Sequence, residues 1–221
     1  MFVDRLYYPV TTLGPGERIV VWTCGCTKHC PGCANPELWE MRPEAALPNE
    51  RLAALLLDLA ARTGAHRLTF TGGDPLEQAD DLAEVLAAVR PTFDDILVYT
   101  GFVLEGEALL TGDTSNGLLS PQNSLDGFTA STPEALLRCR LPAALEPLID
   151  VIIDGSYVAA LNDGRCGLRG STNQRVIVRS PHLENLYHEE EQKPRRIQNA
   201  VFDGRALSIG IHGRPPKEER P

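Results

Sequence analysis

The amino-acid sequence predicts an α/β fold in which helices cover a parallel sheet. Short, nearly continuous apolar segments alternate with amphipathic segments through the first half of the chain, a pattern typical of strands buried on both faces. The 221 residues are 43% apolar and 23% charged, which is an ordinary globular composition and enough chain for one sizeable domain. Because crossovers between parallel strands are right-handed, the strand ends should share one edge of the sheet.

Four strands and two helices are expected, at ranges set by apolar periodicity and turn residues. The strands are expected at residues 18–23, 67–71, 96–100 and 148–153. The first helix is expected over residues 50–62 with Asn49 as its N-cap, and the second over residues 79–89, ended by Pro91. The first strand leads directly into a cysteine-rich segment.

Three polar segments interrupt or follow this pattern. Residues 111–133, within an insertion at about 104–147, are rich in Ser, Thr, Gly and Asn and are expected to form a long loop. Such a loop is either functional or an insertion without a role. Residues 188–196 are expected to be solvated, and residues 214–221 to form a disordered tail.

Charge and hydropathy exclude several classes of protein. The formal net charge of -9 argues against a nucleic-acid-binding surface, which needs a basic face. No apolar run approaches the length that spans a membrane, and the N-terminal segment MFVDRLYYPV lacks the features of a signal peptide. The protein is therefore expected in the cytoplasm, where clustered thiols stay reduced and indicate metal ligands or catalytic groups.

Four of the six cysteines lie within residues 24–33, and three of them are spaced as Cys26-x3-Cys30-x2-Cys33. Three thiolates on one short loop can hold an iron–sulfur cluster and leave one iron open to a substrate. The alternative is a four-thiolate structural zinc site that also uses Cys24, although such sites usually combine paired C-x2-C knuckles from two segments. We interpret Cys24 as a small buried residue.

These residues resemble a known family. The segment CTKHCPGC at residues 26–33 resembles the CxxxCxxC motif of radical S-adenosylmethionine enzymes, and TGGDPL at residues 71–76 resembles the motif that follows their second strand. Further stretches (GPGERIVVW, CPGCANPELW, VYTGF, DVIIDGSY and RGSTNQR) resemble the activating proteins of anaerobic, class III ribonucleotide reductases. The resemblance runs from about residue 8 to residue 178, apart from the insertion.

The resemblance implies an incomplete (βα) barrel of parallel strands, as a single domain over residues 1–213 with a cluster loop at residues 24–35. It implies one 4Fe–4S cluster per chain, held by Cys26, Cys30 and Cys33, with S-adenosylmethionine on the open iron. No other catalytic residue is implied beyond the ligands of the cluster and of the cofactor. The residues expected to bind the cofactor are Gly32, Ala34, Gly72, Gly73, Asp74 and Asp154.

The two glycines suit this role because they leave room for a ligand close to the backbone. Asp154, at the end of the fourth expected strand, could bond a ribose hydroxyl or simply form an Asp-Gly turn. Asn173 and Gln174 are weaker candidates for the neighbourhood of the site.

The resemblance further implies an activating enzyme that generates a 5′-deoxyadenosyl radical and abstracts hydrogen from a glycine of a glycyl radical enzyme. The implied partners are the large subunit of an anaerobic ribonucleotide reductase and a small electron donor such as flavodoxin or ferredoxin, with neither nucleic acid nor membrane. Two alternatives stay open at this point. One is a radical S-adenosylmethionine enzyme that acts on a different protein or peptide, and the other is a non-catalytic zinc or iron–sulfur binding module.

Overall fold

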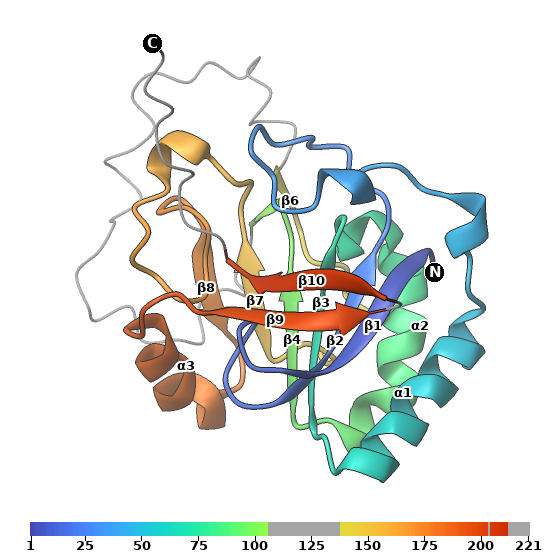
Figure 1. Ribbon diagram of the computed structural model, residues 1–221. Coiled ribbons are helices and arrows are strands. Elements are labelled where there is room, and N and C mark those ends of the chain that lie inside the picture. The colour runs from blue at the N-terminus through green and yellow to red at the C-terminus, as the bar shows by residue number, and fades with distance from the viewer. Residues whose placement is uncertain (106–137, 203, 212–221) are drawn as a thin grey trace.

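A computed structural model describes residues 1–105, 138–202 and 204–211. Within these residues, six strands form one mixed sheet in the order β1-β2-β3-β4-β7-β8 (Figure 1). Their bounds are β1 (Val3–Val10), β2 (Arg18–Thr23), β3 (Arg67–Gly72), β4 (Asp95–Tyr99), β7 (Val151–Asp154) and β8 (Arg175–Val178). The α/β class and all four expected strands are therefore confirmed, each within three residues of its expected start.

The four central strands, β2, β3, β4 and β7, run parallel to one another. Their carboxyl ends consequently lie along one edge of the sheet, which is where ligands bind in such folds. The two outer strands were not expected, and both are antiparallel: β1 pairs with β2, and β8 pairs with β7. The expectation of a sheet made of parallel strands alone is therefore wrong at both edges. At the β1 edge the reason is the connection: residues 11–17 are too few for the crossover that a parallel pair needs, so β1 and β2 pair antiparallel.

Two helices, α1 (Asn49–Thr63) and α2 (Ala79–Val89), pack on one face of the sheet and bury its largest apolar cluster. Helix α2 has the expected bounds. The expected N-cap of α1 is wrong, because Pro48 occupies the cap position. The Asn49 side chain instead accepts a hydrogen bond from the N-terminal amino group and donates to Asp81 and Glu84.

The opposite face is covered by a hairpin, β9 (Ile197–Phe202) and β10 (Arg205–Gly210), and by α3 (Glu184–Glu191). Figure 1 shows the hairpin in red, crossing in front of the central strands. Part of this cover falls where a solvated segment was expected, at residues 188–196. Most of these residues are exposed, but Glu190 is only 4% exposed, and its carboxylate pairs with Lys193 and Arg196. The segment is therefore largely solvated, as expected, and is anchored at Glu190.

Short elements complete the described chain. Strands β5 (Val103–Leu104) and β6 (Arg138–Cys139) pair with each other. The 3-10 helices are η1 (Pro36–Leu38), η2 (Pro43–Ala45), η3 (Pro75–Gln78), η4 (Arg90–Thr92), η7 (Ala159–Leu161) and η8 (Pro181–Leu183). The expected loop at residues 111–133 and the expected tail at residues 214–221 lie outside the described residues.

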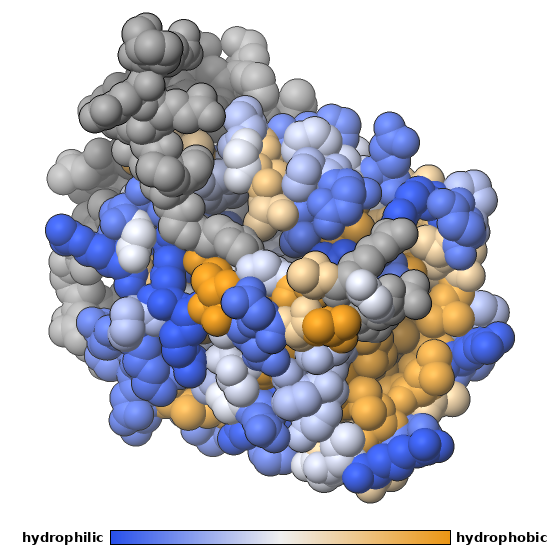
Figure 2. All heavy atoms as spheres, in the orientation of Figure 1, coloured by the Kyte–Doolittle hydropathy of each residue, from blue (hydrophilic) through white to orange (hydrophobic). Residues whose placement is uncertain are grey.

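Figure 2 shows apolar side chains gathered on the right of the view, on the side where Figure 1 places α1 and α2. Leu55 and Leu57 of α1 are 47% and 36% exposed. None of the helices in the described part of the chain combines the length and the apolar character needed to cross a bilayer.

Candidate active site

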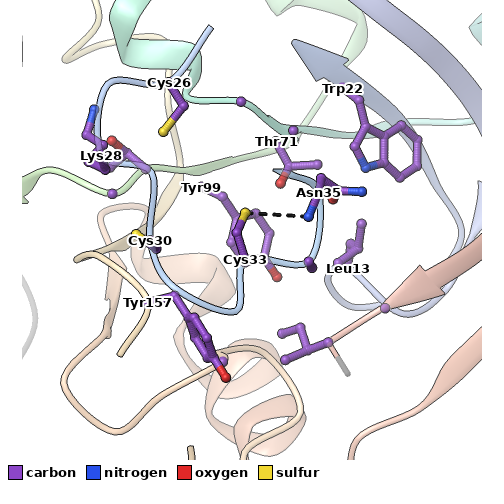
Figure 3. Close-up of a pocket in the computed structure, with 18 of the residues that line it drawn as sticks. Leu13, Trp22, Cys26, Lys28, Cys30, Cys33, Asn35, Thr71, Tyr99 and Tyr157 are labelled. Carbon is purple, nitrogen blue, oxygen red and sulfur yellow. Dashed lines mark hydrogen bonds between the residues drawn. The ribbon is translucent and has the colours of Figure 1, made fainter. Parts of the chain in front are cut away.

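A cavity of about 670 Å³ opens at the carboxyl ends of the parallel strands. Its walls come from the cysteine-rich loop, from the ends of β3 and β4, from the loop after β7 and from strand β10 (Figure 3). Segments that are far apart in the sequence therefore meet at the edge of the sheet where the sequence predicted a site. The cavity also holds the greater part of the residues expected to act in it.

Cys26, Cys30 and Cys33 all line this cavity as free, half-buried thiols. Figure 3 shows the sulfur atoms of Cys26 and Cys33 pointing into the same hollow. Cys24 does not line the cavity. It is fully buried beside Val20 and Trp22, as expected of a small buried residue, and its Sγ accepts a hydrogen bond of 3.3 Å from Arg42.

Backbone amides surround the three sulfur atoms. Burial raises the pKa of the Cys26 thiol, while the amides of Lys28 and His29 hydrogen bond to it and favour the thiolate. Burial likewise raises the pKa of the Cys30 thiol, and the Tyr157 amide opposes that rise. The Asn35 amide donates to Cys33 Sγ over 3.4 Å. Hydrogen bonds from N–H groups to thiolate ligands stabilise iron–sulfur centres and tune their potentials.

The arrangement of the thiols bears on the kind of metal centre. Among the described residues, no three His, Cys, Asp or Glu side chains stand close enough to share a single metal ion. A structural zinc site needs four ligands around one ion, whereas a cubane cluster is ligated by thiolates bound to different irons. Three thiols around one cavity, with Cys24 apart from them, fit the cluster better than the zinc alternative.

Gly72 and Gly73 line the same cavity and bring the end of β3 against the cysteine-rich loop. The Gly73 amide donates to the Thr23 carbonyl over 2.7 Å, and the Asp74 amide donates to the Gly25 carbonyl over 2.7 Å. A Cβ atom at Gly73 would overlap the Gly25 carbonyl, and Gly72 has a φ of +107°. Both positions therefore require glycine for close packing of the backbone, in addition to any room left for a ligand.

Gly32 and Ala34 also line the cavity, on the rim formed by the cysteine-rich loop. Gly32 adopts a φ of +79°, and a Cβ atom there would lie 3.4 Å from the Tyr157 ring. Gln174 lines the cavity, and its side-chain amide donates to the Gly155 carbonyl over 2.8 Å. Asn173 does not line the cavity, but its side-chain amide donates a hydrogen bond of 2.8 Å to the Ser156 carbonyl.

Asp74 and Asp154 are the two expected cofactor residues that do not line the cavity. The Asp154 carboxylate is fully buried and is bound by the Leu104 amide and by Arg175. Asp154 therefore makes its contacts within the fold, and its expected bond to a ribose hydroxyl stays a prediction. The Asp74 carboxylate is 1% exposed and is bound by the Leu76 amide, the Thr100 hydroxyl and the Gly101 amide.

Comparison with known proteins gives the family. Residues 12–119 match a profile described as a 4Fe-4S single cluster domain. An anaerobic ribonucleoside-triphosphate reductase-activating protein from Pasteurella multocida is 31% identical over 177 residues, which cover 77% of this chain and 93% of the relative. The chain belongs to the family of anaerobic ribonucleoside-triphosphate reductase-activating proteins.

Other relatives with that name are matched over similar fractions of their length. The Salmonella typhimurium protein is 29% identical over 77% of this chain and 94% of its own length. The protein of Enterobacteria phage T4 is 27% identical over 80% of this chain and 93% of its own length. The match spans nearly the whole length of each of these activating proteins.

Several residues of the site were missed by the sequence reasoning. Tyr157 lies within the DVIIDGSY stretch that carries the family resemblance, so its position after a strand could have suggested it. The segment 207–211 lines the cavity from the hairpin, and nothing in its composition indicates a site. Lys28 lies inside the cysteine motif, yet its burial depends on contacts with distant residues that the sequence does not reveal.

Proposed function

We propose that this protein activates an anaerobic ribonucleoside-triphosphate reductase by radical S-adenosylmethionine chemistry. One observation carries the proposal: three half-buried cysteines and the Gly72-Gly73 turn line a single cavity at the carboxyl ends of parallel strands. Family membership supports the same activity, because the matched relatives are named as activating proteins of that reductase.

In this proposal, Cys26, Cys30 and Cys33 hold a 4Fe–4S cluster, and S-adenosylmethionine occupies the neighbouring cavity. Together they would supply the 5′-deoxyadenosyl radical that removes a hydrogen atom from a glycine of the reductase. The four parallel strands with their helices support the finer proposal of an incomplete (βα) barrel of the radical S-adenosylmethionine type, within a single domain over residues 1–213.

The protein's own residues would bind and enclose the reactants. Backbone groups at Gly72 and Gly73 face the cavity and offer contacts to the methionyl amino and carboxylate groups. Gly32 and Ala34 would lie against the adenosyl group, since they line the same cavity without long side chains. The hairpin residues 207–211 form part of the cavity wall and would help to keep water from a reactive intermediate.

Three further features of the proposal concern partners and location. A small electron donor such as flavodoxin or ferredoxin would reduce the cluster, and the glycine-bearing part of the reductase would cover the mouth of the cavity. The net charge of -9 supports the absence of nucleic acid from this activity. We further propose that the protein works in the cytoplasm without a membrane partner.

The test uses protein reconstituted with iron and sulfide under anaerobic conditions. About four irons and four sulfides per chain are expected, and the reduced protein should cleave S-adenosylmethionine to methionine and 5′-deoxyadenosine. With the anaerobic reductase of the same organism, electron paramagnetic resonance should detect a glycyl radical. Stoichiometric zinc in anaerobically purified protein, or the absence of cleavage by fully reduced protein, would contradict the proposal.

A further inference from the structure

Lys28 lies between two of the cysteines, yet its side chain is 1% exposed. Its Nζ lies 2.9 Å from Asp74 Oδ2 and 2.7 Å from Glu77 Oε1. Lysine is rarely buried unless its charge is paired, and removing an ammonium group from water costs several kcal/mol or more. The burial of Lys28 in the cysteine-rich loop therefore depends on its paired carboxylates, and the proposed function gives Lys28 no role.

The segment after β4 is shaped around this lysine. The Thr100 hydroxyl and the Gly101 amide donate to the Asp74 carboxylate over 2.9 and 2.8 Å, so the anion that faces Lys28 is held in place. A Cβ atom at Gly101 would lie 3.0 Å from the Lys28 Cδ atom, so the lysine stem packs closely over the backbone of Gly101. Nζ also lies 3.2 Å from the centre of the Phe102 ring, where the ring face attracts a cation.

Glu77, in η3, binds the loop at a second residue. Its Oε1 accepts hydrogen bonds from the Thr27 amide over 3.1 Å and from the Thr27 hydroxyl over 2.6 Å, as well as from Lys28. Burial by itself would raise the pKa of Glu77, but the bonds from Lys28 and Thr27 lower that pKa below its ordinary value. The carboxylate that holds the loop is therefore ionised at neutral pH.

One cation on the segment that joins Cys26 to Cys30 thus pairs with two carboxylates on the chain after β3. We infer that Lys28, Asp74 and Glu77 form an ion-pair clasp, which fixes the cysteine-rich loop on the chain after β3 and sets the reduction potential of the cluster. Lys28 is a positioning residue here, and Asp74 acts through it instead of binding the cofactor. The inference rests on the proposed cluster at Cys26, Cys30 and Cys33.

The charges of Lys28 and Glu77 should shift the reduction potential of the cluster in opposite directions. Reduction adds one negative charge to the cluster, so a nearby ammonium group favours the reduced state and a nearby carboxylate disfavours it. Loss of the Lys28 charge should therefore make the potential more negative. Loss of the Glu77 charge should make it more positive. A residue that only supported the loop would give no such reversal of sign.

The experiment compares Lys28→Met and Glu77→Gln with the unchanged protein, after reconstitution without any partner. Lys28→Met keeps the length of the stem over Gly101, and Glu77→Gln keeps the shape of a side chain that is only 16% exposed. At a fixed potential, Lys28→Met should lower the ratio of reduced to oxidised cluster about tenfold, equivalent to about 59 mV for one electron. Glu77→Gln should raise that ratio. Redox titration followed by electron paramagnetic resonance measures both.

The matched control is Arg62→Met, which removes a positive charge from a side chain that is 74% exposed on α1. Its potential should equal that of the unchanged protein. In metal-free protein, hydrogen exchange of residues 26–30 should become faster in both clasp variants and stay the same in the control, because the loop loses an anchor.

Equal potentials in the unchanged protein and both clasp variants would overturn the inference, as would shifts of the same sign. If Lys28→Met failed to fold, the Glu77→Gln potential would decide alone, and a positive shift is required. An unchanged protein that held no cluster would refute the proposed function itself. A loaded unchanged protein with unshifted variants would refute only the clasp.

Discussion

At the residue scale, the site depends on atoms packed at the limit of close approach. Gly73 touches the Gly25 backbone so closely that any side chain would collide with it. The glycine turn after β3 and the cysteine-rich loop are therefore parts of one rigid unit, linked by the bond from the Asp74 amide to the Gly25 carbonyl. A change on one side of this contact should be felt on the other.

Gly73→Ala should lower the iron content of the reconstituted protein as well as its binding of S-adenosylmethionine, because the added methyl group displaces the cysteine-rich loop. Gly64→Asn is the control, since a Cβ atom there meets nothing within 4 Å and asparagine tolerates the left-handed conformation of Gly64 (φ +72°) at the end of α1. Iron analysis and equilibrium binding of S-adenosylmethionine compare the two variants with the unchanged protein. Full iron content with lost cofactor binding would instead show that Gly73 serves the cofactor alone.

The cysteines differ in what they contact, so alanine substitutions should separate them. Cys26→Ala, Cys30→Ala and Cys33→Ala should each abolish the cluster, because each removes a thiol from the cavity. Cys24→Ala should keep it, because Cys24 is fully buried away from the cavity. Iron and sulfide content and the visible absorption of the cluster measure the result, and a Cys24→Ala protein without cluster would contradict the assignment.

At the element scale, the hairpin β9–β10 closes one side of the cavity while it also covers the sheet. Ile209 of β10 is 2% exposed and belongs to the apolar cluster that contains Val20 and Trp22 of β2. The Thr12 hydroxyl bonds to the Ile209 carbonyl over 3.1 Å. The hairpin is held on the sheet through this strand, so its position as a cavity wall follows from ordinary core packing.

Ile209→Ala should reduce the free energy of unfolding by about 2–5 kcal/mol, the usual cost of truncating a buried isoleucine. Val201→Ala is the matched control on β9, because Val201 is 74% exposed, and surface changes usually stay within about 0.5 kcal/mol. Urea unfolding followed by circular dichroism compares them. Similar losses in the two variants would mean that the hairpin is not anchored through Ile209.

Sequence periodicity predicted the central strands and the two helices that cover them, and it missed the strands at the edges of the sheet. The ranges of β2 and α2 agree with expectation, because continuous apolar strands and amphipathic helices have distinctive patterns. Edge strands such as β1 and β8 mix polar with apolar residues and carry a weaker signal. The three cysteines could be recognised by their spacing. The pairing of the Asp154 carboxylate with Arg175 could not, because it depends on tertiary contacts.

At the scale of the whole molecule, stability and chemistry are placed at opposite ends of the sheet. Arg18 begins β2 and Asp95 begins β4, at the amino ends of strands whose carboxyl ends form the cavity. The two side chains form a buried ion pair of 2.7 Å, and the Tyr187 hydroxyl from α3 donates to the same carboxylate over 2.7 Å. This network joins the sheet to the layer that covers it.

Asp95→Asn should therefore destabilise the entire chain and leave the site unchanged. Removing one partner of a buried ion pair costs about 3–5 kcal/mol, because the remaining charge stays buried without compensation, and Arg18 is fully buried. Arg62→Ala is the control, since its exposed pair with Asp58 is expected to contribute less than about 1 kcal/mol. Urea unfolding measures the loss, while iron content and the reduction potential of the folded variant should match those of the unchanged protein. A shifted potential would show that the two ends of the sheet are coupled, and a loss no larger than that of Arg62→Ala would show that the buried pair contributes little to the fold.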